Sequence, residues 1–582
     1  MKNMYSIVIG IIVGTFISFI NSYSYAISGY TTSEMSIVWV PIIILFIFDR
    51  LMKINYDISD VVVATAIAIG IDITTTLTSG MYITFGFLKY VSSRLKPFGF
   101  NIIVPKHLFA YNGFLDVEAM PTYISLAVIS LGGAFIAYAM RTHFLDKERL
   151  KYPIAVAAAT IAQTLKNIKI GKGFFLTFLL LGFALQMTYF ATGLSIDYTP
   201  ITSMLLPGAV FAVSFSPLLF ALLMLLPLGS LRSFSIGSLL TYLLFIPMAV
   251  KLFGIQLLPS QSYDDMLFSV APVILSYNVG FIVIFLLFYI IRYWSLLARG
   301  LSIVFKFNVE RTAFATGLAY IIFLGVLSIL FAITFMHGFN IAILLVVVTI
   351  VVFLHLILII GNLRVVGESG TGSQALFPLV TIIMYIFGIR NVTLYAMLDP
   401  YTGIPMPQVA ASTSMNLFRF ARFNRANLIN ILKYFCLGVF VGSFITYIYG
   451  NLLVGVYGFN SSQMPLTRWI PTVVWMAAVY QGKLTSQSLN VIFLASLIAI
   501  LVLIANKFVN ILIFPFLVGI TLPPDIGIQT LLAYVIKSII VKFGVSLHEK
   551  VIIGSIIFML GAALALIVNI VLTVMGVNIA WQ

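Results

Sequence analysis

The chain has 582 residues, of which 61% are hydrophobic and only 8% are charged, whereas about a quarter of the residues of a soluble domain are charged. Its mean hydropathy is +1.12, and its long unbroken apolar runs exclude an outer-membrane barrel, whose strands alternate. The net charge of +15 comes from lysines and arginines gathered in short loops, a pattern that orients membrane helices and gives no reason to expect nucleic acid as a partner. We therefore expect an all-α polytopic protein in the lipid bilayer of the plasma membrane.

Apolar runs long enough for a membrane helix recur along the whole chain. A helix needs about 20 mainly apolar residues to cross the bilayer. In the first half, the candidate spans are residues 5–26, 37–51, 60–88, 123–140, 174–190, 204–226, 236–252 and 270–293. In the second half, they are 312–335, 341–360, 431–449, 469–479, 491–505, 508–519, 526–540 and 551–574. Because some of these runs are short, we expect roughly 13 to 16 crossings together with re-entrant segments.

One helical run is too short to cross the bilayer. Residues 154–165 follow the charged hinge 141–153 and precede Lys166, Lys169 and Lys172. The run has about 12 apolar residues, against about 20 needed for a crossing, and it has basic residues at both ends. We therefore expect a surface or re-entrant helix.

Two of the spans are interrupted by polar residues. Residues 72–80 include Asp72, Thr74, Thr75, Thr78 and Ser79. Residues 361–374 include Arg364, Glu368, Ser369, Thr371, Ser373 and Gln374, together with Gly367, Gly370 and Gly372. Irregular backbone at membrane depth requires protein or a water-filled cavity to satisfy its polar groups, and glycine permits such conformations. We predict two broken helices that approach each other near the bilayer midplane around a polar substrate cavity.

Ionisable residues inside apolar runs are costly and are therefore candidates for function. Glu368 is the first candidate for proton coupling, although a salt bridge with Arg364, four residues earlier, is the structural alternative. Arg364 could instead bind a substrate carboxylate. Asp72 is the second candidate, with a local hydrogen bond in the threonine-rich segment as its alternative. For His355, a hydrogen-bonded interior position is favoured over a proton relay.

The order of features suggests a two-fold internal repeat with halves 1–300 and 301–582. Each half has a polar interruption, then a basic helix, then a helix interrupted by serine or proline. The paired stretches are 72–80 with 361–374, 141–172 with 419–433, and 214–217 with 522–525. Such paired interruptions point to the binding site of a transporter.

No enzyme signature is present in the sequence. The 5 histidines are dispersed and lack the spacing of metal ligands. Neither a Gly-x-Ser-x-Gly element nor a phosphate-binding loop occurs. We expect no enzymatic activity, no cofactor and no metal site, and ATP would require a separate subunit.

Three stretches resemble the oligopeptide transporter family, which includes the yellow-stripe-like metal-chelate carriers. They are residues 149–159, with Leu150-Lys151-Tyr152-Pro153, residues 408–424, and residues 514–524, with Gly519 ahead of Leu522-Pro523. The resemblance implies a secondary active transporter that takes up oligopeptides, usually by proton-coupled symport.

Several other functions are open at this point. A metal-chelate or siderophore transporter is the nearest alternative. A permease subunit would need a coupling helix, for which 146–166 and 412–430 are the candidates. A membrane enzyme acting on lipid-linked substrates is a further alternative. For a transporter, the expected partners are protons and a small molecule or short peptide, and a homo-oligomer is compatible with the sequence.

Overall fold

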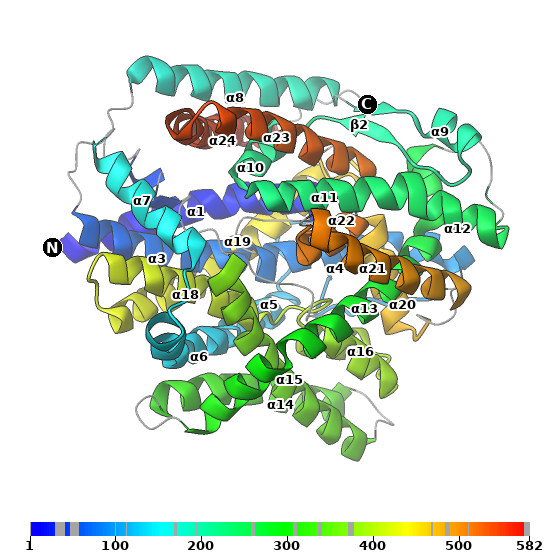
Figure 1. Cartoon of the computed structure of the whole chain (residues 1–582), viewed down its shortest axis with the longest axis horizontal. Coiled ribbons are helices and arrows are strands. Elements are labelled where there is room, and N and C mark those ends of the chain that lie inside the picture. The colour runs from blue at the N-terminus through cyan, green and yellow to red at the C-terminus, as the bar shows by residue number, and fades with distance from the viewer. Residues whose placement is uncertain are drawn as a thin grey trace.

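The protein is an all-α polytopic membrane protein, as its composition predicts (Figure 1). The computed structural model describes residues 2–29, 41–46 except 43, 57–255 except 99, 112, 168–170 and 194, 257, 262–306, 311–335, 340–369, 378–483 except 462, 467 and 468, and 489–575 except 510. Two short strands, β1 (Ser195–Asp197) and β2 (Ala212–Ser214), form an antiparallel pair.

The helices of the first half are α1 (Lys2–Ser28), α3 (Ile58–Thr74), α4 (Met81–Leu95), α5 (Met120–Ile129), α6 (Leu131–Thr142), α7 (Pro153–Asn167), α8 (Lys172–Thr192), α9 (Thr199–Leu205), α10 (Pro217–Leu225), α11 (Leu228–Leu240), α12 (Ile246–Phe253) and α13 (Tyr263–Lys306). Those of the second half are α14 (Arg311–Phe335), α15 (Ile341–Ser369), α16 (Pro378–Ile386), α17 (Val392–Leu398), α18 (Pro407–Phe423), α19 (Leu428–Tyr457), α20 (Ile470–Tyr480), α21 (Leu489–Val509), α22 (Ile513–Thr521), α23 (Pro524–Lys542) and α24 (Val545–Val574). Shorter helical turns are the π-helical Thr75–Gly80, His143–Lys147 and Thr241–Phe245 and the 3-10 turn Lys96–Phe98.

Within the described residues, 11 helices are long enough to cross the membrane, or up to 12 with a bent pair inside α13. For the whole chain, the apolar runs predict roughly 13 to 16 crossings. The expected spans 469–479 and 508–519 correspond to α20, with 11 residues, and α22, with 9. The expected span 204–226 is divided among α9, β2 and α10, and 37–51 lies mostly outside the described residues. Helix α7 has 15 residues and is not a candidate span, in agreement with the prediction for 154–165.

A continuous helix made of α3, the π-helical turn and α4 occupies the core. All residues from 64 to 88 are buried, as expected of a helix that is apolar all round. The helix begins at a capping box, in which Asp57 accepts a hydrogen bond from Ile58 N at 2.8 Å and Asp60 accepts one from Asp57 N. The π-helical turn coincides with the polar interruption 72–80, and such turns often occur at functional sites.

Glycines let the neighbouring helices approach α3 closely. A Cβ added at Gly70 would lie 2.4 Å from Phe435 O and 3.0 Å from Gly438 Cα, both on α19. On α1, a Cβ at Gly14 would lie 2.8 Å from Ala68 Cα of α3. Close packing of small residues holds membrane helices together, because lipid provides no hydrophobic force between them. These glycines therefore serve packing within the chain.

The two halves of the sequence are interleaved in space. Helix α19 packs on α3, α24 on α8, α22 and α23 on α11, and α21 on α13. Figure 1 shows α8 and α24 at one edge of the bundle and α14 at the opposite edge, with α3 and α19 between them. The ranges 1–300 and 301–582 therefore share their packing surfaces throughout.

Candidate functional site

Helix α18 is a polar helix inside the core. It begins at Pro407, a residue suited to the first position of a helix, and all residues from 402 to 418 are buried. Gln408, Ser412 and Asn416 are four residues apart, so they lie along one face of the helix, and each is 0% exposed. Helices α3, α6, α7, α15 and α19 all contact α18. A buried polar face of this kind is expensive in a membrane protein unless it has a use.

A buried loop, residues 399–406, separates α17 from α18 and is organised by Asp399. The Asp399 carboxylate accepts hydrogen bonds from Thr381 Oγ1 at 2.7 Å, from Tyr401 N at 3.1 Å, and from the backbone N and hydroxyl of Thr402. Tyr480 donates to Thr402 O at 2.9 Å. Together α17, the loop and α18 form a broken helix whose irregular backbone is satisfied by protein.

Helix α15 presents two polar side chains to this broken helix. His355 is buried, and its Nε2 lies 2.9 Å from Leu398 O. Because a carbonyl can only accept, Nε2 carries the ring proton and Nδ1 is an acceptor, which has no partner among the described residues. Asn362 donates to Gln408 O at 2.9 Å. His355 is therefore an interior histidine held by a backbone carbonyl at the edge of the broken helix.

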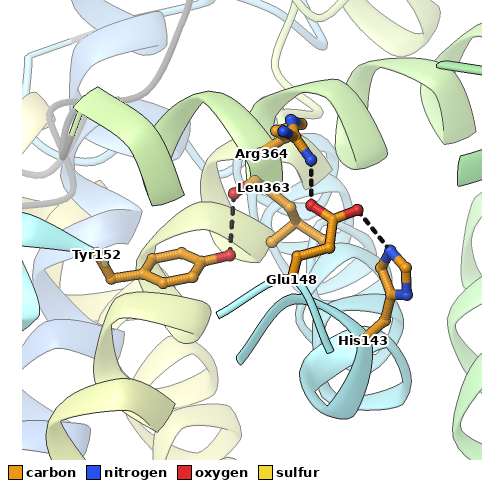
Figure 2. A network of polar contacts seen from close by, with 5 residues as sticks. All are labelled: His143, Glu148, Tyr152, Leu363 and Arg364. Atoms are coloured by element: carbon orange, nitrogen blue, oxygen red, sulfur yellow. Dashed lines mark hydrogen bonds and ion pairs between the residues drawn. The ribbon is translucent and has the colours of Figure 1, made fainter. Parts of the chain in front are cut away.

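The hinge loop, residues 143–152, binds the end of α15 (Figure 2). Glu148 lies between Arg364, with which it forms an ion pair, and His143, whose Nε2 is 2.8 Å from the Glu148 carboxylate. Glu148 thus gives Arg364 a partner from the first half of the chain, and the expected alternative, a salt bridge between Arg364 and Glu368, stays untested. The side chain of Glu368 lies outside the described part of the structure.

The segment 361–374 is not broken where the structure describes it. Helix α15 continues to Ser369 because the hinge loop satisfies its end: Tyr152 N donates to Gly367 O and Tyr152 OH to Leu363 O, each at 3.0 Å. A Cβ at Gly367 would lie 2.6 Å from Leu150 Cδ1, so this glycine permits close approach of the loop rather than a break. The predicted site residues Thr371, Ser373 and Gln374 fall within 370–377, outside the described residues, as does the side chain of Ser369.

The same hinge loop also binds the end of α18. Both terminal nitrogens of Arg422 donate to the carboxylate of Asp146, one of them at 2.9 Å. The side chains of Arg422 and Asp146 are 31% and 48% exposed, so the pair is near the surface of the bundle. The ends of α15 and α18 are therefore fastened to one loop of the first half.

Asp72 lies in the core, at the end of α3 just before the π-helical turn. It is 4% exposed, and Asn21 of α1 donates to its Oδ1 at 2.5 Å. The expected alternative, a local hydrogen bond within the threonine-rich segment, is thus replaced by a bond to another helix. Two hydroxyls from the π-helical turn, those of Thr75 and Ser79, are buried and have no partner among the described residues. Among the described residues, the buried carboxyl of Asp72 therefore has one hydrogen-bond donor, the neutral amide of Asn21.

The other threonines of this segment face α19. The hydroxyl of Thr446 lies 3.0 Å from that of Thr74 and also bonds to the hydroxyl of Thr78. Thr74 and Thr78 additionally donate to the backbone, to Ile71 O at 2.7 Å and to Thr74 O at 2.9 Å. These hydroxyls are satisfied within the bundle, which assigns them to helix packing.

The segments 72–80 and 361–369 have different neighbours. The first contacts α1, α4, α5 and α19, whereas α15 contacts α18, α7 and the hinge loop. Helix α18 contacts both α3 and α15, so it packs against the helix that leads into 72–80 and against the helix that contains 361–369. The approach of 72–80 to 370–374 stays a prediction, because the latter residues are not described.

Asp116 and Asp525 are buried, as Asp399 is. Asp116 accepts from Ala110 N at 2.6 Å and from Tyr82 OH at 3.2 Å. Asp525, after a proline pair, accepts from Ser214 Oγ at 2.7 Å and from Tyr263 OH at 2.8 Å.

The sequence signal that could have found the broken helix is the set of prolines at 400, 405 and 407 ahead of the polar run that begins at Gln408.

Comparison with known proteins adds no assignment. No family model matches the chain, and no curated protein matches it significantly. Among the described residues, no group of three or more His, Cys, Asp or Glu side chains could hold a metal ion.

Proposed function

We propose that the protein is a secondary active transporter that moves a small polar solute, an oligopeptide by the resemblance noted above, together with protons. The observation that carries this proposal is the broken helix α17–α18, which places a buried polar face in the middle of a membrane bundle. Helices interrupted near the core are the elements from which transporter binding sites are built.

Two further features support transport. The polar face of α18 begins at the buried loop 399–406 and leads along the helix toward Arg422, which is partly exposed. The hinge loop binds the C-terminal end of α18 through an ion pair of Asp146 with Arg422. It binds the end of α15 through an ion pair of Glu148 with Arg364. Alternating access requires such contacts to form in one state and break in the other, and ion pairs near the surface are weak enough to do so.

Asp72 is the best described group for proton coupling. Asp399 accepts four hydrogen bonds, so protonation, which turns one carboxylate oxygen into a donor, would disturb the loop that these bonds hold. Asp72 has one described donor, Asn21, so it can bind and release a proton without dismantling its surroundings. Glu368, the first candidate from the sequence, stays a second candidate because its side chain is not described.

The test is uptake into proteoliposomes that contain the purified full chain. Labelled short peptides are supplied with an imposed pH gradient, with an imposed sodium gradient, and with neither. We expect accumulation above equilibrium only with the pH gradient, acid outside. A parallel series with iron–siderophore chelates separates the peptide carrier from the metal-chelate carrier. Equal equilibration of all solutes under every gradient would reject secondary active transport.

A further inference from the structure

Gln408, at the start of α18, has two polar side-chain atoms and no described partner for either. Its amide nitrogen and amide oxygen are both buried without a hydrogen bond to any residue that the structure describes, and the side chain is 0% exposed. Its backbone oxygen, in contrast, accepts a hydrogen bond from Asn362 at 2.9 Å. Buried polar groups are nearly always paired, because leaving them unpaired costs free energy.

Gln408, whose amide is unpaired within the described residues at a cost in free energy, lies at the start of the polar helix on which the proposed function rests. It is the second residue of α18 and directly follows the buried loop 399–406. It begins the polar face that continues through Ser412 and Asn416. On α15, His355 Nδ1 is a second buried acceptor without a described partner, and it lies beside Leu398, where the same loop begins. Unpaired groups therefore occur at both ends of the loop that breaks the helix.

The chemistry of the side chain indicates what would pair with it. A primary amide offers two N–H donors and a carbonyl acceptor. In an extended peptide, the N–H and the C=O of one residue lie on the same side of the chain, so a primary amide can accept from the one and donate to the other. Both sides are neutral, so the contact involves no desolvation of charge.

We infer that Gln408 binds the transported solute directly, through hydrogen bonds between its side-chain amide and an amide group of the ligand. This inference rests on the proposed transport function and adds a contact residue and a ligand chemistry to it. The side-chain amide of Gln408 has no partner among the described residues, and in this proposal the ligand supplies one.

The experiment compares the wild-type chain with Gln408→Met, which keeps the length of the side chain and removes its polar atoms. Thermal unfolding of the detergent-purified full chain is measured with increasing tetraglycine and with tetrasarcosine, which has the same backbone carbonyls but N-methylated amides. We expect Gln408→Met to unfold at a higher temperature than wild type without ligand, because an unpaired amide has been removed. We expect its affinity for tetraglycine to fall about tenfold or more, and wild type to prefer tetraglycine to tetrasarcosine.

The matched control is Ser414→Ala on the same helix. Ser414 is equally buried, but its hydroxyl donates to Ala411 O at 2.9 Å, so this variant should keep the tetraglycine affinity of wild type. The inference is overturned if Gln408→Met unfolds below wild type, which would make the amide structural, or keeps wild-type affinity. It is also overturned if tetraglycine does not stabilise wild type, or if tetrasarcosine does so equally well. A failure of gradient-driven uptake with these ligand shifts intact would count against the proposed transport alone.

Discussion

Asp72 and Asp399 are both buried carboxyl groups beside an irregular stretch of helix, yet their surroundings differ. Asp399 receives hydrogen bonds from two threonine hydroxyls and two backbone N–H groups. Asp72 receives one from a described residue, Asn21, and lies next to a turn with two hydroxyls that have no partner among the described residues. The first arrangement fixes the loop around the carboxylate, whereas the second has few contacts to lose when the carboxyl changes its protonation state. We therefore propose that the number of hydrogen-bond donors separates a structural acid from a coupling acid.

The largest expected effect is on the stability of the protein when Asp399, the structural acid of this pair, is replaced. Asp399→Ala leaves two hydroxyls and two N–H groups of the buried loop without their acceptor, so we expect a loss of about 3 kcal/mol or more in the free energy of unfolding. Thermal unfolding of the purified protein in detergent measures it. Thr381→Val, which removes a single donor, should lose about 1 kcal/mol. An Asp399→Ala variant as stable as wild type would show that the loop does not depend on this carboxylate.

On the coupling side, Asp72→Asn should leave stability within about 1 kcal/mol of wild type, because the asparagine oxygen can still accept from Asn21. Accumulation driven by a pH gradient should fall at least about tenfold, which corresponds to about 1.4 kcal/mol, while exchange of labelled for unlabelled solute continues. Normal proton-driven accumulation in this variant would exclude Asp72 as the coupling group. Glu368→Gln in the same assay tests the other carboxyl.

A smaller effect is expected at the far end of α18. Arg422 and Asp146 are partly exposed, so their ion pair should contribute only about 0.2–1 kcal/mol. A double-mutant cycle with Arg422→Gln and Asp146→Asn measures this coupling energy. A value of several kcal/mol would mean that this end of the helix is as firmly fixed as the Asp399 loop, and would exclude it as a contact that opens during transport.

The smallest effect is expected at Thr446, in the threonine cluster beside Asp72. Thr446→Val removes the hydroxyl shared by Thr74 and Thr78, but both keep backbone acceptors. We expect a loss of about 1 kcal/mol or less, with proton-driven uptake unchanged. If uptake fails while the protein stays folded, the cluster belongs to the coupling site rather than to helix packing.

The sequence by itself determined the class of the protein, most of its spans and one candidate acid. Apolar runs predict membrane helices because the bilayer sets a minimum length, and Asp72 stands out because a carboxyl inside such a run is costly. Helix α7 was predicted not to cross for the same reason of length. These inferences need only local composition.

Only the tertiary structure decided which polar groups meet. Arg364 forms an ion pair with Glu148, 216 residues away in the chain, and no local pattern indicates this pair. The glycines 367, 370 and 372 suggested a break within 361–374, and in the described part of this segment Tyr152 and Leu150 pack against Gly367 while the helix continues to Ser369. The burial of Asp399 depends on how α16, α17 and α20 enclose it. Whether a side chain is buried, and which group it pairs with, depends on contacts between segments that are far apart in the chain, and local sequence patterns do not show which segments meet.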